Sequence, residues 1–371
     1  MLYHTLLGGE KSSMSNCPIF IVGYLHSGTT LLRNIFQDHP DIFTGEGETR
    51  FFDYLPTIRR NFPDLTDDQT LHDYLFYLAR LIRTNYGKVH IERDTKGLSS
   101  FQTLGFSQTE IDALYHAASE QRDHAKLFGL VSDALCIHYD KERWLEKTPT
   151  HLFHIDAILE ATPNARFIAI VRDPRDVLSS KRSRQQEEWI NQTNVDRRAV
   201  KKIQAGFDPL WDTLAWKSAV RAVSTAETKH PGRILSIRYL DLVTEPEATV
   251  RSLCDFLELD YYDTMLDVGW VNSTTRSRQN RGIGTASVGK WQKNLTPEMV
   301  ALCQAIARRE MKMLDFPLTP IALSTQLKMP LLLGRSGYEF FERLGRRWRI
   351  GGFGFVRNVL ENYWLRFVNV R

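Results

Sequence analysis

The feature that most constrains the fold is a short apolar run followed by a glycine-rich loop and a helical stretch near the N-terminus. Residues 18–24, PIFIVGY, form a continuous apolar run that reaches a glycine, which is typical of a strand buried in a parallel sheet. A helix is predicted over 28–38, and His39-Pro40 ends it because the residue before a proline avoids the helical region. The unit is therefore a strand, a tight turn and a helix.

The turn in this unit has the character of an anion-binding loop. Gly23 and Gly28 show the G-x-x-x-x-G spacing of phosphate-binding loops, and Thr29 and Thr30 add hydroxyl donors. Backbone N–H groups and the positive end of the helix dipole point at one spot in such a turn. Thr29 stands where a nucleotide-hydrolysing loop carries its lysine, so a smaller, metal-free anion is favoured. A plain strand–helix turn that contains glycines is the alternative.

The rest of the chain alternates strands and helices around a long helical region. Residues 53–142 show amphipathic helical spacing and little sign of strands. Further strands are predicted within 41–52, 143–149, 166–172 and 233–239, and helices over 174–185, 211–229 and 297–312. This pattern predicts an α/β fold, a P-loop-like parallel sheet flanked by helices, with a helical insert at 53–142 and a helical C-terminal tail.

The expected organisation is an N-terminal extension (1–16), a main domain (17–316), and a linker with a basic, aromatic tail (317–371). The net charge is only +4, and from Arg335 onward the chain holds eight arginines against three glutamates. The basic character is thus local to the tail, and no nucleic-acid partner is expected.

Composition excludes several classes of protein. A chain of 371 residues with 42% apolar residues can bury a full core, so disorder is not its main character. Its four cysteines lie far apart, without C-x-x-C or nearby histidine pairs, which predicts neither a zinc site nor a disulfide framework. The apolar runs are short of the roughly 20 residues that span a bilayer, and no signal pattern begins the chain, so we expect a cytoplasmic protein.

A second anion site is predicted in VRDPRDVLSSKRSR, residues 171–184. Arg172 ends a predicted parallel strand, at the sheet edge where open α/β sheets bind ligands. Ser180 and Arg184 are four residues apart and share a helical face, so two arginines and a hydroxyl suit a phosphate monoester. Arg172 beside Asp173 also disfavours a divalent cation there. The alternative is a solvated basic helix.

Together the two sites resemble those of sulfotransferases that use 3′-phosphoadenosine-5′-phosphosulfate (PAPS). The resemblance rests on S-G-T-T at Ser27–Thr30 and on R-D-P-R-x-x-x-x-S at Arg172–Ser180. It is nearest to the tyrosylprotein and bacterial branch, because LLRNIFQDHPDIFTGEGETR continues the loop as in that branch. The likeness extends from about Pro18 to Gln304 and is weak in the helical insert.

The resemblance implies how the donor would be held, without a metal. The loop would grip the 5′-phosphosulfate, the strand end at Arg172 would bind the 3′-phosphate, and later segments would close over the nucleotide. The residues it assigns are His26, Ser27, Gly28, Thr29 and Thr30 for the loop, Arg172, Ser180 and Arg184 for the 3′-phosphate, and Tyr239, Ser287 and Lys290 for the closing segments. Arg281-Gly282 is an alternative to the last pair, and Tyr239 could instead be an aromatic residue capping the sheet edge.

The resemblance also implies three catalytic residues. Glu48 matches the base that accepts the acceptor's proton, with Glu46 as runner-up and pairing with Arg50 as the structural alternative. Lys147 matches the lysine that stabilises charge on the leaving group. His26 departs from the family, which places arginine or lysine there, and histidine can act as a cation or as a neutral donor.

The expected acceptor is a hydroxyl of a carbohydrate, a glycolipid or a small molecule, bound near the helical insert. The aromatic and arginine-rich tail suits peripheral contact with an anionic membrane, and its alternatives are packing on the main domain or a homodimer. A P-loop kinase or NTPase and a non-catalytic, membrane-associated anion-binding protein are the competing functions.

Overall fold

The structure is a computed structural model that describes residues 17–45, 47–84, 101–183, 207–269 and 282–331, together with 333, 334, 336–338, 341 and 345 of the tail. Its centre is a five-stranded sheet in the order β2-β3-β1-β4-β5, in which every neighbouring pair is parallel. The strands are β1 Ile19–Gly23, β2 Ile42–Thr44, β3 Arg143–Lys147, β4 Arg166–Val171 and β5 Ile234–Arg238. The predicted parallel sheet is therefore confirmed.

Helices cover both faces of this sheet, as the apolar run of β1 requires. Ile19 and Ile21 belong to one core cluster, and Phe20 and Val22 to another, and all four side chains are fully buried. The first cluster includes α2 Thr29–Gln37, α12 Tyr239–Thr244 and α13 Pro246–Leu257. The second includes α6 His124–His138, α7 Ile155–Ala161 and α11 Pro209–Lys229. Each fully buried side chain of this size contributes about 1.5–3 kcal/mol.

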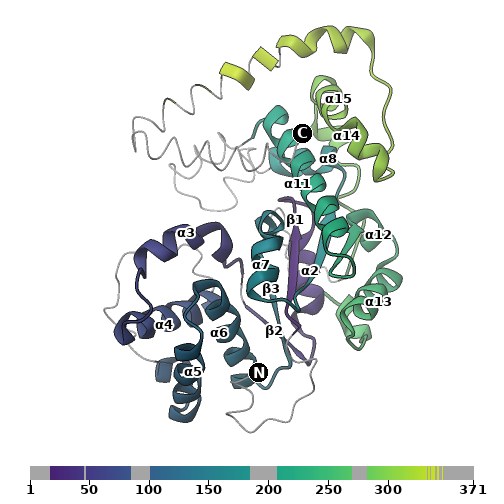
Figure 1. The fold of residues 1–371 in the computed structure, drawn as a ribbon. Coiled ribbons are helices and arrows are strands. Elements are labelled where there is room, and N and C mark those ends of the chain that lie inside the picture. The colour runs from purple at the N-terminus through teal and green to yellow at the C-terminus, as the bar shows by residue number, and fades with distance from the viewer. Residues whose placement is uncertain are drawn as a thin grey trace.

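The region between β2 and β3 is helical, as predicted. It contains α3 Phe51–Asn61, α4 Asp68–Thr84, the 3₁₀ turn Phe101–Leu104, α5 Gln108–Glu120 and α6. These helices lie together on the β2 side of the sheet, opposite α12 and α13 (Figure 1). The insert shares the core of the sheet, since Phe128 of α6 stacks on Phe51 at 4.4 Å and meets Trp144 of β3 edge-on at 5.8 Å.

The remaining elements are short turns and three further helices. They are two 3₁₀ turns, Pro149–Phe153 and Asp263–Leu266, and the helices α8 Pro174–Ser183, α14 Trp291–Asn294 and α15 Pro297–Met313. α14 lies outside the helices and strands predicted above, and Tyr239 opens α12 where the sequence placed it at the end of a strand. Residues 323–331 are helical, while most of the tail lies outside the described residues. Within the described part, no helix combines the length and apolar character needed to cross a membrane.

Candidate active site

The carboxyl ends of all five strands lie at one edge of the sheet, because every neighbouring pair is parallel. In the spatial order of the strands, this edge carries Glu48 after β2, Lys147 at the end of β3, residues 24–28 after β1, Arg172 after β4 and Tyr239 after β5. Residues spread over more than 200 positions of the sequence, from Tyr24 to Tyr239, therefore form one row. We call residues 24–28 the loop.

The loop has a backbone that depends on glycine. Gly28 has φ 108° and caps α2 without a side-chain hydrogen bond, so no side chain of this cap occupies the N–H groups of the first turn. A Cβ at Gly28 would lie 2.5 Å from Cδ2 of Tyr239, and one at Gly23 would lie 2.6 Å from the carbonyl oxygen of Ile170. His26 also has a left-handed backbone, with φ 67°. The geometry is that of an anion-binding helix N-terminus.

The hydroxyl groups of the loop and of the first turn of α2 differ in their surroundings. Thr29 is buried and Thr30 is exposed, both in the first turn of α2. Ser27 is fully buried, and its Oγ has no hydrogen-bond partner in the described part of the chain. Ser27 lines a small cavity together with Trp216 and Val220.

Arg172 joins the loop to the other side of the row. Its Nη1 donates to the carbonyl oxygen of His26 at 3.1 Å, and its Nη2 donates to that of Ser287 at 2.6 Å. The guanidinium lies over the ring of Tyr239, 4.5 Å from the centroid, and the residue is only 8% exposed. The two anion sites predicted from the sequence are thus in direct contact.

Two further contacts complete this network. Ser180 Oγ lies 3.3 Å from Nδ1 of His26, and the Tyr239 hydroxyl lies 2.6 Å from Oγ of Ser287. Asp173 caps α8 by accepting from the N–H of Arg175 at 2.8 Å, which orients the helix that carries Ser180. Arg184, Arg281 and Glu46 lie outside the described residues.

The segment carrying Ser287 is fastened to α8 by a residue that the sequence analysis missed. Asp176 accepts hydrogen bonds from the N–H groups of Gly289 at 2.9 Å and Trp291 at 3.3 Å. Burial raises the pKa of Asp176, although these N–H groups and Arg172 act in the opposite direction. The position of Asp176 in the first turn of α8, four residues after Arg172, was the available signal. Lys290 is exposed at the N-cap of α14, and the described residues show no side-chain hydrogen bond for it.

At the other end of the row, Lys147 and Glu48 form an ion pair. Nζ of Lys147 donates to Oε1 of Glu48 at 2.8 Å, and the side chains are 6% and 37% exposed. The alternative pairing of Glu48 with Arg50 is not what the described residues show, because Arg50 Nε instead lies 3.3 Å from Oδ2 of Asp53. The sequence thus named both partners but not their contact.

The carboxylate of Asp173, which follows Arg172 in the sequence, pairs with Arg175. Both oxygens of Asp173 accept from the guanidinium of Arg175, at 3.0 and 2.6 Å. Among the described residues, no group of three His, Cys, Asp or Glu side chains is arranged to hold a metal ion. The prediction that the site works without a metal stays a prediction. The cysteines in the described part are free thiols.

A family model described as the sulfotransferase family matches residues 18–263, well over half of the chain. The chain therefore belongs to the sulfotransferase family, and the resemblance found in its motifs is confirmed.

Two of the relatives that match the chain are named as sulfotransferases. Stf3 of Mycobacterium bovis, an omega-hydroxy-beta-dihydromenaquinone-9 sulfotransferase, is 32% identical over 127 residues, which cover 32% of this chain and 30% of Stf3. Protein-tyrosine sulfotransferase 1 of Danio rerio is 24% identical over 252 residues, 67% of this chain and 55% of that protein. The matched part spans less than two thirds of either relative. Among solved structures, the sulfotransferase domain of the Synechococcus PCC 7002 olefin synthase is similar, with a TM-score of 0.44, 19% identity, and coverage of 79% of this chain and 94% of that domain.

Proposed function

We propose that the protein transfers a sulfuryl group from PAPS to a hydroxyl group of an acceptor. The observation that carries the proposal is the contact of Arg172 with the loop, since it brings two anion sites within reach of one nucleotide that has anionic groups at both its 5′ and its 3′ position. An ordinary nucleoside triphosphate has no 3′-phosphate for the second site. A phosphosulfate at the loop and a phosphate at Arg172 together select the donor.

The residues at the row fit such a donor. The α2 N-terminus without a side-chain cap supplies backbone donors for the 5′-phosphosulfate, with His26, Ser27, Gly28, Thr29 and Thr30 around it. Nε of Arg172 is buried without a hydrogen-bond partner among the described residues, so the guanidinium has a donor left for an anion. In the proposal, Arg172, Ser180 and Arg184 hold the 3′-phosphate, and Tyr239, Ser287 and Lys290 close over the nucleotide.

We assign the catalytic steps of sulfuryl transfer to the ion pair of Lys147 and Glu48. The donor supplies a sulfuryl group bonded to a phosphate that leaves when the acceptor oxygen attacks sulfur. Glu48 accepts the proton of the acceptor hydroxyl as general base. Lys147 stabilises the negative charge that develops on the departing phosphate oxygen, and His26 contributes as a cation or a neutral donor. Positioning and charge stabilisation carry most of such a reaction, as in phosphoryl transfer.

The acceptor we propose is a hydroxyl of a carbohydrate, a glycolipid or another small molecule. The names of Stf3 and of the tyrosine sulfotransferase indicate acceptors that also carry a hydroxyl, one on a menaquinone derivative and one on a protein. Glu48 is 37% exposed, which leaves room for an acceptor on its side of the row, next to the helical insert. The insert, residues 53–142, is therefore proposed as the acceptor region of a sulfotransferase domain at 17–316.

The proposed location of the protein is the cytoplasm, with peripheral contact between the tail and a membrane. Leu323, Leu327 and Leu331 recur at helical spacing and are more than 70% exposed. Liposome flotation of the full chain and of a chain ending at Thr319 tests this contact. Equal flotation of the two would leave packing on the domain or a homodimer, which sedimentation distinguishes.

The function itself is tested by ligand-induced stabilisation and by transfer. Adenosine 3′,5′-bisphosphate is expected to raise the melting temperature, while ATP with magnesium is not. Radiolabelled PAPS with a panel of hydroxyl acceptors then tests transfer. Stabilisation by ATP and magnesium would support a kinase or NTPase instead, and binding without transfer to any acceptor would support a non-catalytic protein.

A further inference from the structure

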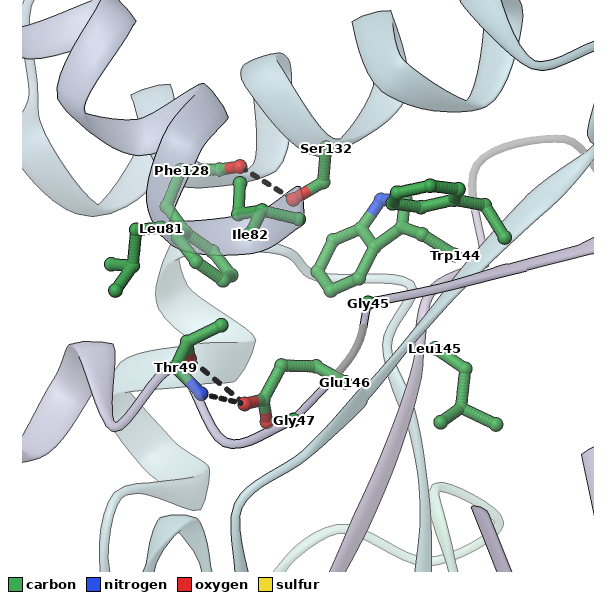
Figure 2. A pocket seen from close by; sticks show the side chains of 11 residues that line it. Gly45, Gly47, Thr49, Leu81, Ile82, Phe128, Ser132, Trp144, Leu145 and Glu146 are labelled. Atoms are coloured by element: carbon green, nitrogen blue, oxygen red, sulfur yellow. Dashed lines mark hydrogen bonds between the residues drawn. The ribbon is translucent and has the colours of Figure 1, made fainter. Parts of the chain in front are cut away.

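A buried carboxylate lies directly behind the ion pair of Lys147 and Glu48. Glu146 of β3 is 5% exposed and points away from Lys147, to the insert side of the sheet. It lines a small cavity with Phe43, Leu81, Ile82, Phe128 and Trp144 (Figure 2). A carboxylate among apolar side chains is destabilising by several kcal/mol unless it is paired and hydrogen-bonded. The groups that pair with Glu146 and donate hydrogen bonds to it are therefore needed to keep it buried.

One oxygen of the Glu146 carboxylate accepts hydrogen bonds from the sequence neighbours of both members of the ion pair. Oε1 of Glu146 accepts from the N–H of Thr49 at 3.2 Å and from its hydroxyl at 2.8 Å, as Figure 2 shows. The same oxygen accepts from the hydroxyl of Thr148 at 2.6 Å. Thr49 directly follows Glu48, and Thr148 directly follows Lys147. A single atom thus binds the neighbour of each member of the pair.

The second oxygen lies at ion-pair distance from a buried histidine, although the two side-chain atoms lack the geometry of a hydrogen bond. Nδ1 of His151 lies 2.9 Å from Oε2 of Glu146, and the His151 side chain is fully buried. Burial by itself would raise the pKa of Glu146, but His151 and the hydroxyl groups of Thr148 and Thr49 outweigh it and lower that pKa. The carboxylate is therefore ionised at neutral pH, and its hydrogen bonds are of the stronger, charge-assisted kind.

The ion pair alone is too weak to define its own geometry. Glu48 is 37% exposed, and ion pairs with a solvent-exposed member typically contribute about 0–1 kcal/mol. Two residues further on, the N–H of Arg50 donates to the Thr148 hydroxyl at 3.1 Å, which extends the same connection. The segment from 47 to 50 is thus fastened to the end of β3 through the Glu146 carboxylate and the hydroxyl groups that it binds.

We propose that Glu146 is a positioning residue that sets the separation of Glu48 and Lys147 by binding Thr49 and Thr148. This inference rests on the proposed function, since it assigns Glu146 a part in transfer without contact to either substrate. Small displacements of a catalytic group reduce the rate steeply, by up to about 100-fold for 1 Å. The binding of the donor, which uses the other end of the row, is independent of Glu146.

The first test compares Thr49→Val with Thr49→Ser. The valine has the shape of threonine but no hydroxyl donor, whereas the serine keeps the donor. Thr49→Val is expected to lower kcat about tenfold, with the affinity for adenosine 3′,5′-bisphosphate within about twofold of wild type, while Thr49→Ser stays within about twofold in both. Equal kcat values for the two variants would overturn the proposal.

The second test measures the segment without any catalysis. In Glu146→Gln, amide hydrogen exchange in a peptide covering residues 47–52 is expected to be at least about tenfold faster than in wild type, because the acceptor of the Thr49 N–H loses its charge. Asp133→Asn is the matched control, since Asp133 accepts from Nε1 of Trp144 at 2.9 Å beside the same cavity and the described residues show no bond from it to the segment. Unchanged exchange in Glu146→Gln would refute the connection.

A double-mutant cycle separates positioning from general loss of stability. If Glu146 acts through Glu48, then Glu146→Gln lowers kcat about tenfold in the wild-type background and less than about twofold in Glu48→Gln. Additive losses would contradict the proposal. A wild-type protein without donor binding or transfer would refute the proposed function, and the exchange measurement would still decide whether Glu146 holds the segment. Should Glu146→Gln not fold, the Thr49 pair decides.

Discussion

The two ends of the row at the sheet edge are built differently. The donor end consists of Arg172, Ser180, Tyr239 and Ser287, and the transfer end of Glu48 and Lys147. At the donor end the side chains contact each other and the loop directly, and Arg172 is bound to backbone carbonyl groups on two sides. At the transfer end the ion pair of Glu48 and Lys147 is connected to the rest of the site through Glu146, which lies behind it.

The two ends also differ in the exposure of their side chains and in the pKa values of the carboxylates behind them. Arg172 is 8% exposed, while Glu48 is 37% exposed in its side chain. The pKa values of the buried carboxylates behind the two ends are shifted in opposite directions. Burial raises the pKa of Asp176 against its backbone N–H donors, whereas His151 and the threonine hydroxyl groups outweigh burial at Glu146 and lower its pKa. In the proposed function, the buried donor end is organised before binding, and the more exposed Glu48 stays accessible to an acceptor.

Lys147→Ala gives the largest effect that would separate the two ends. We expect kcat to fall about 1000-fold, because a charge placed at the leaving group is removed, with donor affinity within about threefold. Single-turnover rates with labelled PAPS and calorimetry with adenosine 3′,5′-bisphosphate measure the two quantities. Lys141→Ala, just before β3, is the control. A parallel fall in affinity would show that the two ends act as one.

Arg172→Ala is expected to have the converse effect at the donor end. The affinity for adenosine 3′,5′-bisphosphate should fall about 100-fold, since a buried arginine bound on several sides is lost. Arg166→Ala is the matched control, because Arg166 begins the same strand at the opposite edge, where it pairs with Glu258. Calorimetry on both variants checks this, and equal losses would remove Arg172 from the binding site.

Gly28→Ala tests the junction of the loop with the donor end. Its Cβ would meet the ring of Tyr239 at 2.5 Å, at a φ of +108° that already disfavours alanine. We expect bisphosphate affinity to fall about 30-fold, from strain of a few kcal/mol. Gly232→Ala has a φ of +77° but nothing within 4 Å, so it measures backbone strain alone. A similar affinity for the two variants would mean that Tyr239 moves aside freely.

His26 tests a residue that links the loop to α8. His26→Ala is expected to lower activity about tenfold near neutral pH, because a donor to the phosphate and the contact with Ser180 are lost. His26→Arg is expected to retain activity, because it restores a cation. Initial rates at pH 7 decide the matter. An unchanged rate in the alanine variant would remove His26 from the mechanism.

The smallest expected effect is on the pH dependence of stability, because the pKa values of Glu146 and Asp176 are shifted in opposite directions. The pKa of Glu146 is lowered in the folded state, so its contribution to stability is present above its unfolded pKa and is lost as the pH falls through the folded value. The pKa of Asp176 is raised, so its contribution is present at low pH and is lost as the pH rises.

We expect the stability of wild type relative to Glu146→Gln to fall by about 1 kcal/mol as the pH drops below about 4.5, and its stability relative to Asp176→Asn to rise. Urea unfolding between pH 3 and 7 measures both differences. Changes of the same sign in the two comparisons would contradict the assigned shifts.

Much of the fold could be predicted from local pattern. The apolar run of β1, the glycines of the loop and the start of α8 at Asp173-Pro174 each act within a few residues, so the sequence displays them directly. The site residues were named one motif at a time for the same reason. Their roles stay proposals, but the row they form at the sheet edge agrees with the predicted pairing of two anion sites.

The contacts that hold the site could not be predicted in this way. Thr49 and Glu146 are 97 positions apart, and Asp176 and Gly289 are 113 apart, so no periodic pattern connects them. The order of the strands has the same origin, since β3 lies next to β1 although a long helical insert separates the two strands in the sequence.

The sequence by itself determined the elements, because backbone preferences and apolar periodicity act over short distances. It also determined which chemical groups stand at the strand ends. Only the tertiary structure decided which of those groups meet, because strand order and buried charge pairing depend on packing between distant segments. The pairing of Glu48 with Lys147, and the buried carboxylate of Glu146 behind them, exist for that reason.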